Sequence, residues 1–364
     1  MSVLSCRSPY RLTNCPVGGA DKVNDVVEKH VTDGPTSQWS EQARQARLHF
    51  VSGKGGTGKT TVAATLALTL ASRGQRVLLV ECEERQGIAQ LFDTHPLPPV
   101  DTQVATLEGG GSVWALPLQI EYALLEYLDM FYNLGFAGRA IKRVGAIDFV
   151  TTVAPGLRDV VITGKVKERV IALDKKGHRL YDSIVVDSPP TGRIGNFLDV
   201  TSAMRDLTKT GPIRKQSDGV AKLLHSPDTM VHLCTLLEAM PIQETIEAVD
   251  ELRAKELNIG AIFINRVEPA YLPDDQLDAI AEGRIDADKV RASMAEAGVA
   301  VTDDDLSGLL TETVDYASRT QAQQVARAEL DDVDAPQIEL PSVENGMDLG
   351  GLYELVDVMK KAGV

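Results

Sequence analysis

The feature that most constrains this chain is a glycine-rich loop between a short apolar run and a helical run. Residues 53–60 read G-K-G-G-T-G-K-T, which satisfies the pattern G-x-x-x-x-G-K-[ST]. The apolar run Leu48–Val51 precedes the loop, and the helical run Thr60–Ser72 follows it and stops before Gly74. Glycines at this spacing let backbone N–H groups turn inward at a helix start, where the helix dipole favours an anion. The loop therefore predicts a strand–loop–helix unit that binds phosphate groups.

A second carboxylate, together with this loop, predicts a nucleotide site that uses magnesium. Lys59 should reach the β- and γ-phosphates of ATP, and the Thr60 hydroxyl should coordinate Mg²⁺. Residues 181–187 read Y-D-S-I-V-V-D and end in Asp187, which should hold a magnesium-bound water. We therefore expect ATP and Mg²⁺ as cofactors. The candidate phosphate-binding residues are Gly53, Gly55, Gly56, Thr57, Gly58, Lys59, Thr60 and Thr61.

Short β-branched runs alternate with helical patterns along the chain. Near-continuous apolar runs suit parallel strands that are buried on both faces. Five runs are predicted strands: Leu48–Val51, Val77–Val80, Ile184–Val186, Val231–Cys234 and Ala261–Ile264. Two further candidates are Val113–Leu116 and Ile338–Leu340. The predicted fold class is α/β, a P-loop NTPase with a doubly wound, mostly parallel sheet and an inserted helical subdomain.

The chain divides into a predicted tail and one predicted domain. Residues 1–45 mix Ser, Pro, Gly, Asn and charged residues without periodicity, which predicts a disordered tail. Residues 46–364 form the P-loop domain, with a helical subdomain at about 117–180 and 195–228. Apolar residues from Ile120 to Leu134 recur at helical spacing. This helix either packs on a neighbouring helix or lines an apolar groove.

Composition limits the classes of function. The chain has 37 Lys and Arg against 52 Asp and Glu, a net charge of −15, so we expect no nucleic-acid partner. The longest apolar stretch, Val62–Ala71, contains two Thr residues and falls far short of the roughly 18 residues that span a bilayer. The four cysteines form no C-x-x-C pair. We expect a cytoplasmic or membrane-peripheral protein with no integral membrane segment.

Two segments indicate that nucleotide state is linked to motion and to a second subunit. Residues 188–193 read S-P-P-T-G-R, and their glycine could let the backbone swing when a γ-phosphate leaves. The alternative is a plain strand-to-helix turn. Lys54, a second lysine early in the loop, resembles the signature of the deviant Walker A subclass. Members of that subclass dimerise so that this lysine reaches the partner's nucleotide, whereas the alternative is a solvated lysine.

The segments G-K-G-G-T-G-K-T-T at 53–61 and Y-D-x-I-V-V-D-x-P-P-T-G-R at 181–193 resemble the ArsA-type family of arsenite-pump ATPases. That family includes the GET-pathway ATPase that guides tail-anchored proteins to membranes. The resemblance runs from about Leu48 to the C-terminus, and several segments of the sequence are similar to those of actinobacterial anion-transporting ATPases. It implies a dimeric ATP hydrolase, either a homodimer or a heterodimer with a paralogue. Asn265 resembles the family's adenine-reading Asn, and we group Arg266 and Pro341 with it.

The chain departs from the family pattern at two positions. Glu83 stands at the position of the family's water-polarising Asp, and Arg193 stands where family members often have His. A longer carboxylate either still orients water or slows hydrolysis severely, since a shift of about 1 Å can cost on the order of a hundredfold. The resulting candidate catalytic residues are Lys54, Lys59, Glu83 and Asp187.

Several functions remain open at the level of sequence. The first is an ATPase that couples hydrolysis to a switch handling a membrane-associated client or transport partner. The alternatives are the energising ATPase of an anion (metalloid) efflux system, a ParA-like positioning ATPase, and a regulatory nucleotide binder with little turnover. A metalloid centre needs soft thiolates, and the predicted domain offers only Cys82 and Cys234. The C-terminal apolar face that includes Leu352 and Met359 should pack in the core, because Glu354 and Asp357 disfavour an acidic lipid surface.

Overall fold

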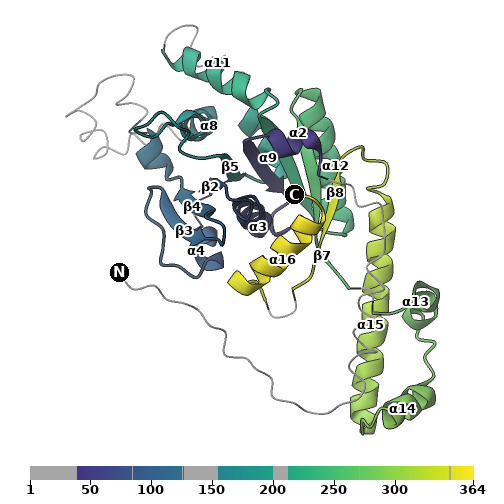
Figure 1. Ribbon diagram of the computed structural model, residues 1–364. Helices are drawn as coiled ribbons and strands as arrows, with labels where there is room; N and C mark the ends of the chain where they lie inside the picture. Colours follow the sequence, from purple (N-terminus) through teal and green to yellow (C-terminus); the bar gives the residue numbers. More distant parts are fainter. Residues whose placement is uncertain are drawn as a thin grey trace, which may run out of the picture. The chain divides into compact units, whose positions relative to one another are not determined.

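The computed structural model describes residues 39–364 except 84, 125, 127–154, 200–211, 270 and 344–345. These residues form an eight-stranded sheet with the order β3-β4-β2-β5-β1-β6-β7-β8 (Figure 1). All neighbouring strands are parallel except β3 and β4. The strands are β1 (Leu48–Gly53), β2 (Arg76–Glu81), β3 (Thr102–Thr106), β4 (Ser112–Pro117), β5 (Ser183–Asp187), β6 (Thr229–Thr235), β7 (Ile259–Val267) and β8 (Gln337–Pro341).

The predicted α/β class and all seven predicted strands are confirmed. The remaining strand of the sheet, β3, was not predicted. It is the antiparallel edge strand, and its five residues are exposed or only half-buried. An edge strand of this kind lacks the continuous apolar run by which a central parallel strand is recognised.

Helices cover both faces of the sheet, as a doubly wound fold requires. Alternate residues of a strand face opposite sides, so Phe50 lies in one buried cluster and Val51 in the other. The Phe50 cluster includes residues of α8 (Pro155–Ile171), α9 (Thr191–Leu198), α11 (Pro212–Leu224) and α12 (Ala239–Ala254). The Val51 cluster includes residues of α2 (Glu41–Gln45), α3 (Lys59–Ala71), α4 (Gly87–Leu91) and α16 (Leu349–Lys361).

Helix α3 leads away from the glycine-rich loop and is buried from Val62 to Ala71. Figure 1 shows α16 beside α3, and the two helices are in contact. The inward face of α16 (Leu352, Leu355, Val356 and Met359) is buried, so the expected core packing of this helix is confirmed. Gly74, with φ +86°, stands just beyond the end of α3, as the sequence predicted. The buried faces of α3 and α16 thus pack in one cluster, with Thr69 near the C-terminal end of α3 in contact with Met359.

The predicted boundary of the N-terminal tail was wrong by several residues. Helix α2 begins at Glu41, and Trp39 before it is only 2% exposed. The Trp39 ring stacks on the ring of His232, with 4.9 Å between the ring centroids. The segment is short and mostly polar, so its few inward side chains left no periodic signal. Residues 1–38 lie outside the described residues.

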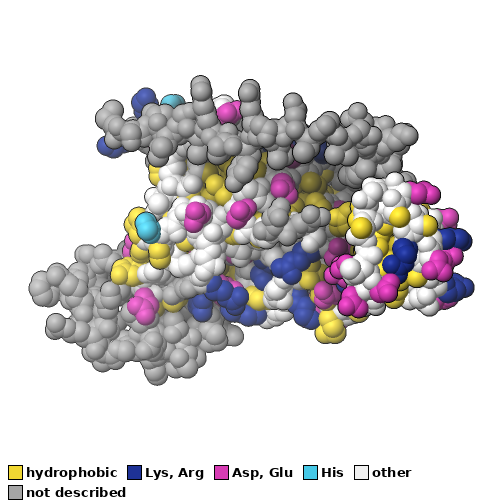
Figure 2. All heavy atoms as spheres, turned by 90° about the horizontal axis from the view of Figure 1, so that it is seen from below, with side chains coloured by type: hydrophobic (Ala, Val, Ile, Leu, Met, Phe, Trp, Pro, Cys, Tyr) yellow, Lys and Arg dark blue, Asp and Glu magenta, His cyan; other side chains and the backbone are white. Residues whose placement is uncertain are grey.

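An insertion between β7 and β8 was not predicted. It contains α13 (Asp274–Ala281), α14 (Ala287–Glu296) and α15 (Asp303–Ala328), and we call it the β7–β8 insertion. Only three side chains of the long helix α15 are buried. Acidic and basic side chains are interspersed on the lobe that contains this insertion (Figure 2), with ion pairs such as Lys289–Asp286 and Arg291–Asp303. Helices with so little apolar surface give a weak periodic pattern.

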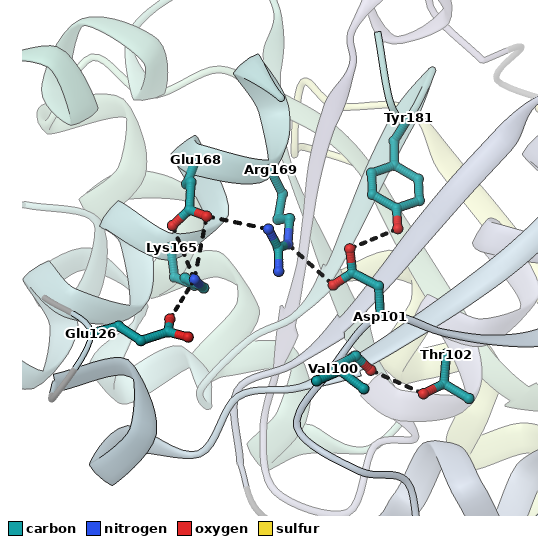
Figure 3. A network of polar contacts seen from close by, with 8 residues as sticks. All are labelled: Val100, Asp101, Thr102, Glu126, Lys165, Glu168, Arg169 and Tyr181. Atoms are coloured by element: carbon teal, nitrogen blue, oxygen red, sulfur yellow. Dashed lines mark hydrogen bonds and ion pairs between the residues drawn. The ribbon is translucent and has the colours of Figure 1, made fainter. Parts of the chain in front are cut away.

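The predicted helical subdomain is represented by α8, α9 and α11, while the amphipathic helix at 120–134 lies mostly outside the described residues. A polar network holds α8 to the sheet (Figure 3). Asp101, just before β3, accepts hydrogen bonds from Arg169 of α8 at 3.1 Å and from the Tyr181 hydroxyl at 2.8 Å. Lys165 of α8 adds an ion pair with Glu126. In the part of the chain that the structure describes, no helix is long and apolar enough to cross a membrane.

Candidate nucleotide site

The predicted loop joins β1 to α3 and can be built only from glycine at two of its positions. A Cβ atom on Gly53 would lie 2.1 Å from the carbonyl oxygen of Cys234 in the neighbouring strand. Gly58 has φ +95°, and a Cβ atom there would lie 2.2 Å from the side-chain nitrogen of Asn265. Both distances are shorter than any real contact, and the positive φ is unfavourable for other residues. Glycine at these two positions therefore lets the loop pass close to Cys234 and Asn265 before α3 begins.

The Thr60 hydroxyl and the Asp187 carboxylate meet at the floor of the loop. Thr60 Oγ1 donates a hydrogen bond of 2.7 Å to Asp187 Oδ2. Asp187 ends β5, which pairs with β1, so the sheet places Asp187 beside the loop that leads from β1 to Thr60 at the start of α3. Burial raises the pKa of Asp187 to about 6, although the Thr60 hydrogen bond and the charge of Lys59 act in the opposite direction. A hydroxyl and a carboxylate in contact form the oxygen donor set that Mg²⁺ prefers.

These residues line a cavity of about 250 Å³ at the carboxyl end of the sheet. Parallel sheets bind ligands at this end. The lining residues are Gly56, Gly58, Lys59, Thr60, Thr61, Glu81, Glu83, Arg85 and Asp187. Most of the predicted phosphate-binding and catalytic residues therefore lie around one cavity.

Asn265 holds the loop from behind. Its Nδ2 atom donates a hydrogen bond of 2.8 Å to the carbonyl oxygen of Thr57, which also accepts the Cys234 thiol at 3.2 Å. The Asn265 side chain is buried in this arrangement. Arg266 follows with φ +55° and is exposed, and exposed Pro341 pairs in register with Val267 at the ends of β8 and β7. The adenine-binding role of Asn265, Arg266 and Pro341 stays a prediction.

Lys54 forms an ion pair with Glu244 that the sequence did not predict. Its Nζ atom lies 2.8 Å from Glu244 Oε1 of α12, and Lys54 is absent from the described residues that line the cavity. Glu244 Oε2 also accepts a hydrogen bond of 3.2 Å from the hydroxyl of Thr191, the first residue of α9. Glu244 thus joins the early lysine to the predicted switch segment. Nothing in the local sequence around residue 244 distinguishes it from a solvated glutamate.

Glu83 and Glu81 differ in their surroundings. Glu83 Oε2 pairs with Arg85 at 3.2 Å on the cavity wall, and its side chain is 26% exposed. Glu81, which the sequence interpretation passed over, is 2% exposed. Burial, with a smaller effect from Asp187, raises the pKa of Glu81 to about 7. Its position at the carboxyl end of β2 was the one available signal, because ligands of parallel sheets lie at such ends.

The two cysteines of the described part of the chain lie in separate buried clusters. Cys82 and Cys234 are buried, and burial raises the pKa of Cys82 well above its usual value and that of Cys234 to about 12. Among the residues described, no group of three or more His, Cys, Asp and Glu could hold a metal ion. A magnesium ion at Thr60 and Asp187 would therefore take its remaining ligands from phosphates and water.

Comparison with known proteins decides the family. A sequence profile described as "Anion-transporting ATPase" matches residues 46–227. The chain is 56% identical to the ATPase BagA of Mycobacterium tuberculosis over 339 residues, which is 93% of this chain and all of that protein. The chain belongs to the anion-transporting ATPase family.

Two more distant relatives carry different names. The putative arsenical pump-driving ATPase 2 of Aquifex aeolicus is 26% identical over 64% of this chain and 84% of its own length. The ATPase GET3 of Zygosaccharomyces rouxii is 20% identical over 62% of this chain and 73% of its own. The predicted resemblance to the ArsA and GET ATPases, including its actinobacterial character, is therefore confirmed. As an anion-transporting ATPase, the chain has the P-loop NTPase fold of a family of ATP hydrolases that use ATP with magnesium.

Proposed function

We propose that this chain is an ATPase that binds MgATP at the 53–60 loop and hydrolyses it as a dimer, using a Lys54 from each subunit on the nucleotide of the other. The observation that carries the proposal is the geometry of Lys54. The other loop lysine, Lys59, lines the cavity, whereas Lys54 is bound to Glu244 outside it. The position of Lys54 outside the cavity of its own subunit supports a role at the site of a second subunit.

The residues around the cavity divide the work of hydrolysis. Main-chain N–H groups around residues 55–60 and the Lys59 ammonium bind the phosphates. Thr60 and Asp187 hold the magnesium ion, which neutralises charge on the phosphates when bound. Glu83, on the cavity wall, orients the attacking water. Lys54 from the partner neutralises charge on the transferring phosphoryl group, as an arginine finger does.

The ion pair between Lys54 and Glu244 gives the switch a physical basis. Because Glu244 also binds Thr191, release of Lys54 towards a partner removes a constraint on the first turn of α9. Thr191 follows Pro189 and Pro190, a stiff segment joined directly to Asp187 through Ser188. Dimerisation and magnesium binding therefore act on the same segment, residues 188–193.

Mixing two inactive variants tests the trans role of Lys54. The Lys54→Ala variant keeps an intact phosphate pocket, whereas Lys59→Ala keeps Lys54 and loses nucleotide affinity. We expect each variant alone to lose about a thousandfold in turnover, as arginine-finger losses do. A mixture should recover turnover at the composite site in which the Lys59→Ala subunit supplies Lys54. A mixture as inactive as its parts, with both proteins folded and shown to associate, would mean that Lys54 does not act across a dimer.

We further propose that the switch handles a membrane-associated client, a transport partner or hydrophobic cargo. The support is similarity to relatives named GET3 and arsenical pump-driving ATPase. The efflux alternative is weaker, because Cys82 and Cys234 are buried in separate places and protonated. A labelled apolar peptide of about 20 residues should bind the Asp187→Asn variant more tightly with ATP than with ADP. Turnover stimulated by arsenite would favour efflux instead, and salt-sensitive DNA retention would favour positioning.

A further inference from the structure

The buried carboxylate of Glu81 has one oxygen with a partner and one without. Glu81 Oε1 accepts a hydrogen bond of 2.7 Å from the backbone N–H of Gly87. Glu81 Oε2 is buried and has no hydrogen-bond partner. Buried polar groups almost always have partners in folded proteins, so an orphaned carboxylate oxygen beside a cavity indicates a missing ligand.

The orphaned oxygen lies beside the proposed magnesium site. Glu81 lines the same cavity as Thr60 and Asp187, and in the sheet it is the register partner of Asp187. A Cβ atom built on Gly87 would lie 3.4 Å from Glu81 Oε1 and 3.2 Å from Thr60 Cγ2, so both side chains border the same small space. The three residues therefore surround one point at the ends of β2, β5 and the loop.

The described part of the chain supplies no cation to Glu81, although the charge of Lys59 acts on Asp187. Among the described residues, Glu81 forms no ion pair with Lys or Arg, and the charged group that acts on it is the carboxylate of Asp187. Two neighbouring buried carboxylates repel each other unless a proton or a cation lies between them. Magnesium dehydrates reluctantly and keeps several waters in protein sites. A carboxylate oxygen such as Glu81 Oε2 can only accept hydrogen bonds, and a water of that hydration shell can donate one.

Resting on the proposed function, we infer that Glu81 is a positioning residue for the hydrated divalent cation: its Oε2 atom accepts a hydrogen bond from a metal-bound water. Asp187 and Thr60 act from one side of the cation, and Glu81 acts from the neighbouring strand. Such outer-shell partners typically change metal affinity by about 10- to 100-fold. Glu81 would therefore raise the affinity of the nucleotide complex for the metal without contacting the phosphates.

The test measures metal affinity directly. Electron paramagnetic resonance can count free Mn²⁺ during titration of the full chain saturated with ADP or with a non-hydrolysable ATP analogue. We expect Glu81→Gln to weaken Mn²⁺ binding about tenfold or more, while nucleotide affinity in EDTA stays within about twofold. Glutamine keeps the acceptor for Gly87 N–H, so a residue that only supports this turn would show no change. Unchanged Mn²⁺ affinity in Glu81→Gln would overturn the inference.

Two further variants keep the result interpretable. Asp101→Asn is the control, since it removes a half-buried carboxylate that does not line the cavity, and its Mn²⁺ affinity should stay within about twofold of the wild type. Glu81→Asp keeps the charge on a shorter stem and should fall between the wild type and Glu81→Gln, and it replaces the Gln variant if that one does not fold. Wild-type protein that binds no nucleotide, with or without metal, would contradict the proposed function itself. Normal wild-type binding with no effect at Glu81 would remove this inference alone.

Discussion

The sheet buries two pairs of ionisable side chains, and the chain satisfies only one of them. In β1 and β6, Ala261 N–H donates to His232 Nδ1, His232 Nε2 lies 3.1 Å from His49 Nδ1, and His49 Nε2 lies 3.2 Å from the carbonyl oxygen of Ala46. In β2 and β5, Glu81 and Asp187 lie side by side, and Glu81 Oε2 has no partner. The hydrogen bonds of the first pair are complete within the chain, whereas repulsion within the second is relieved only by a proton or a cation.

The order of donors in the histidine pair fixes both tautomers. His232 Nδ1 must accept, so Nε2 carries the proton and donates to His49, whose own Nε2 proton points at Ala46. Every ring nitrogen is satisfied while both rings are neutral. Burial lowers the pKa of His49 to about 4 and that of His232 below its usual value. We therefore interpret the histidine pair as structural, and we attribute the incomplete carboxylate pair to the proposed ligand site.

The largest effect that would sharpen this comparison is on turnover. Asp187→Asn keeps the size of the side chain but removes the charge that accepts the Thr60 hydrogen bond and that we propose to hold the metal. We expect turnover to fall by about a hundredfold or more while ATP still binds. Single-turnover hydrolysis and equilibrium ATP binding measure the two quantities separately. Turnover within a few-fold of the wild type would mean that the carboxylate pair is structural, like the histidine pair.

The histidine pair predicts a loss of stability in mild acid. The folded-state pKa of His49 lies below its unfolded value near 6.5, so its contribution is complete above pH 6.5 and is lost as pH falls towards about 4. Between pH 7 and pH 5 this loss is about 2 kcal/mol. The difference in unfolding free energy between the wild type and His49→Leu should shrink by that amount. A difference that is constant across these pH values would show that the pair is not held neutral.

Removal of the Thr60 hydroxyl should have a smaller effect, confined to the metal. Thr60→Ala deletes the donor to Asp187 and the proposed magnesium ligand. We expect nucleotide affinity with Mg²⁺ to fall about tenfold and affinity in EDTA to be unchanged. Thr61→Ala, the neighbouring residue on the same helix, is the matched control for this titration. Equal losses with and without Mg²⁺ would count against the metal assignment.

A further effect concerns stability at the carboxylate pair. The folded-state pKa of Glu81 is raised above its unfolded value, so its favourable contribution is present at low pH and is lost as pH rises through about 7. Glu81→Gln should therefore gain stability relative to the metal-free wild type as pH rises from 5 to 8. Denaturant titrations at several pH values measure the change, and a gain in the acidic direction would contradict the assigned burial of charge.

The sequence predicted the parts of the site that lie within contiguous motifs. The 53–60 loop combines glycine spacing with flanking strand and helix signals, and Asp187 ends a continuous apolar run. Glu244 and the loop-facing role of Asn265 could not be found in this way, because each depends on a partner about 190 or more residues away. Glu81 was missed because the family pattern directed attention to Glu83, two residues later.

The fold shows the same division. Central strands were recognised by apolar runs, whereas β3 and the β7–β8 insertion bury too little surface to leave such a signal. Trp39 was assigned to a tail because its partner, the ring of His232, lies in a distant strand. Elements that the core surrounds can therefore be predicted locally, and elements that depend on a single long-range contact cannot.

Isothermal titration calorimetry of ATP into folded wild-type protein, with and without Mg²⁺, tests the central claim most directly. The account predicts saturable binding that is tighter with Mg²⁺, with one nucleotide for each chain. A protein that remains folded and shows no heat of binding with ATP and Mg²⁺ would contradict it.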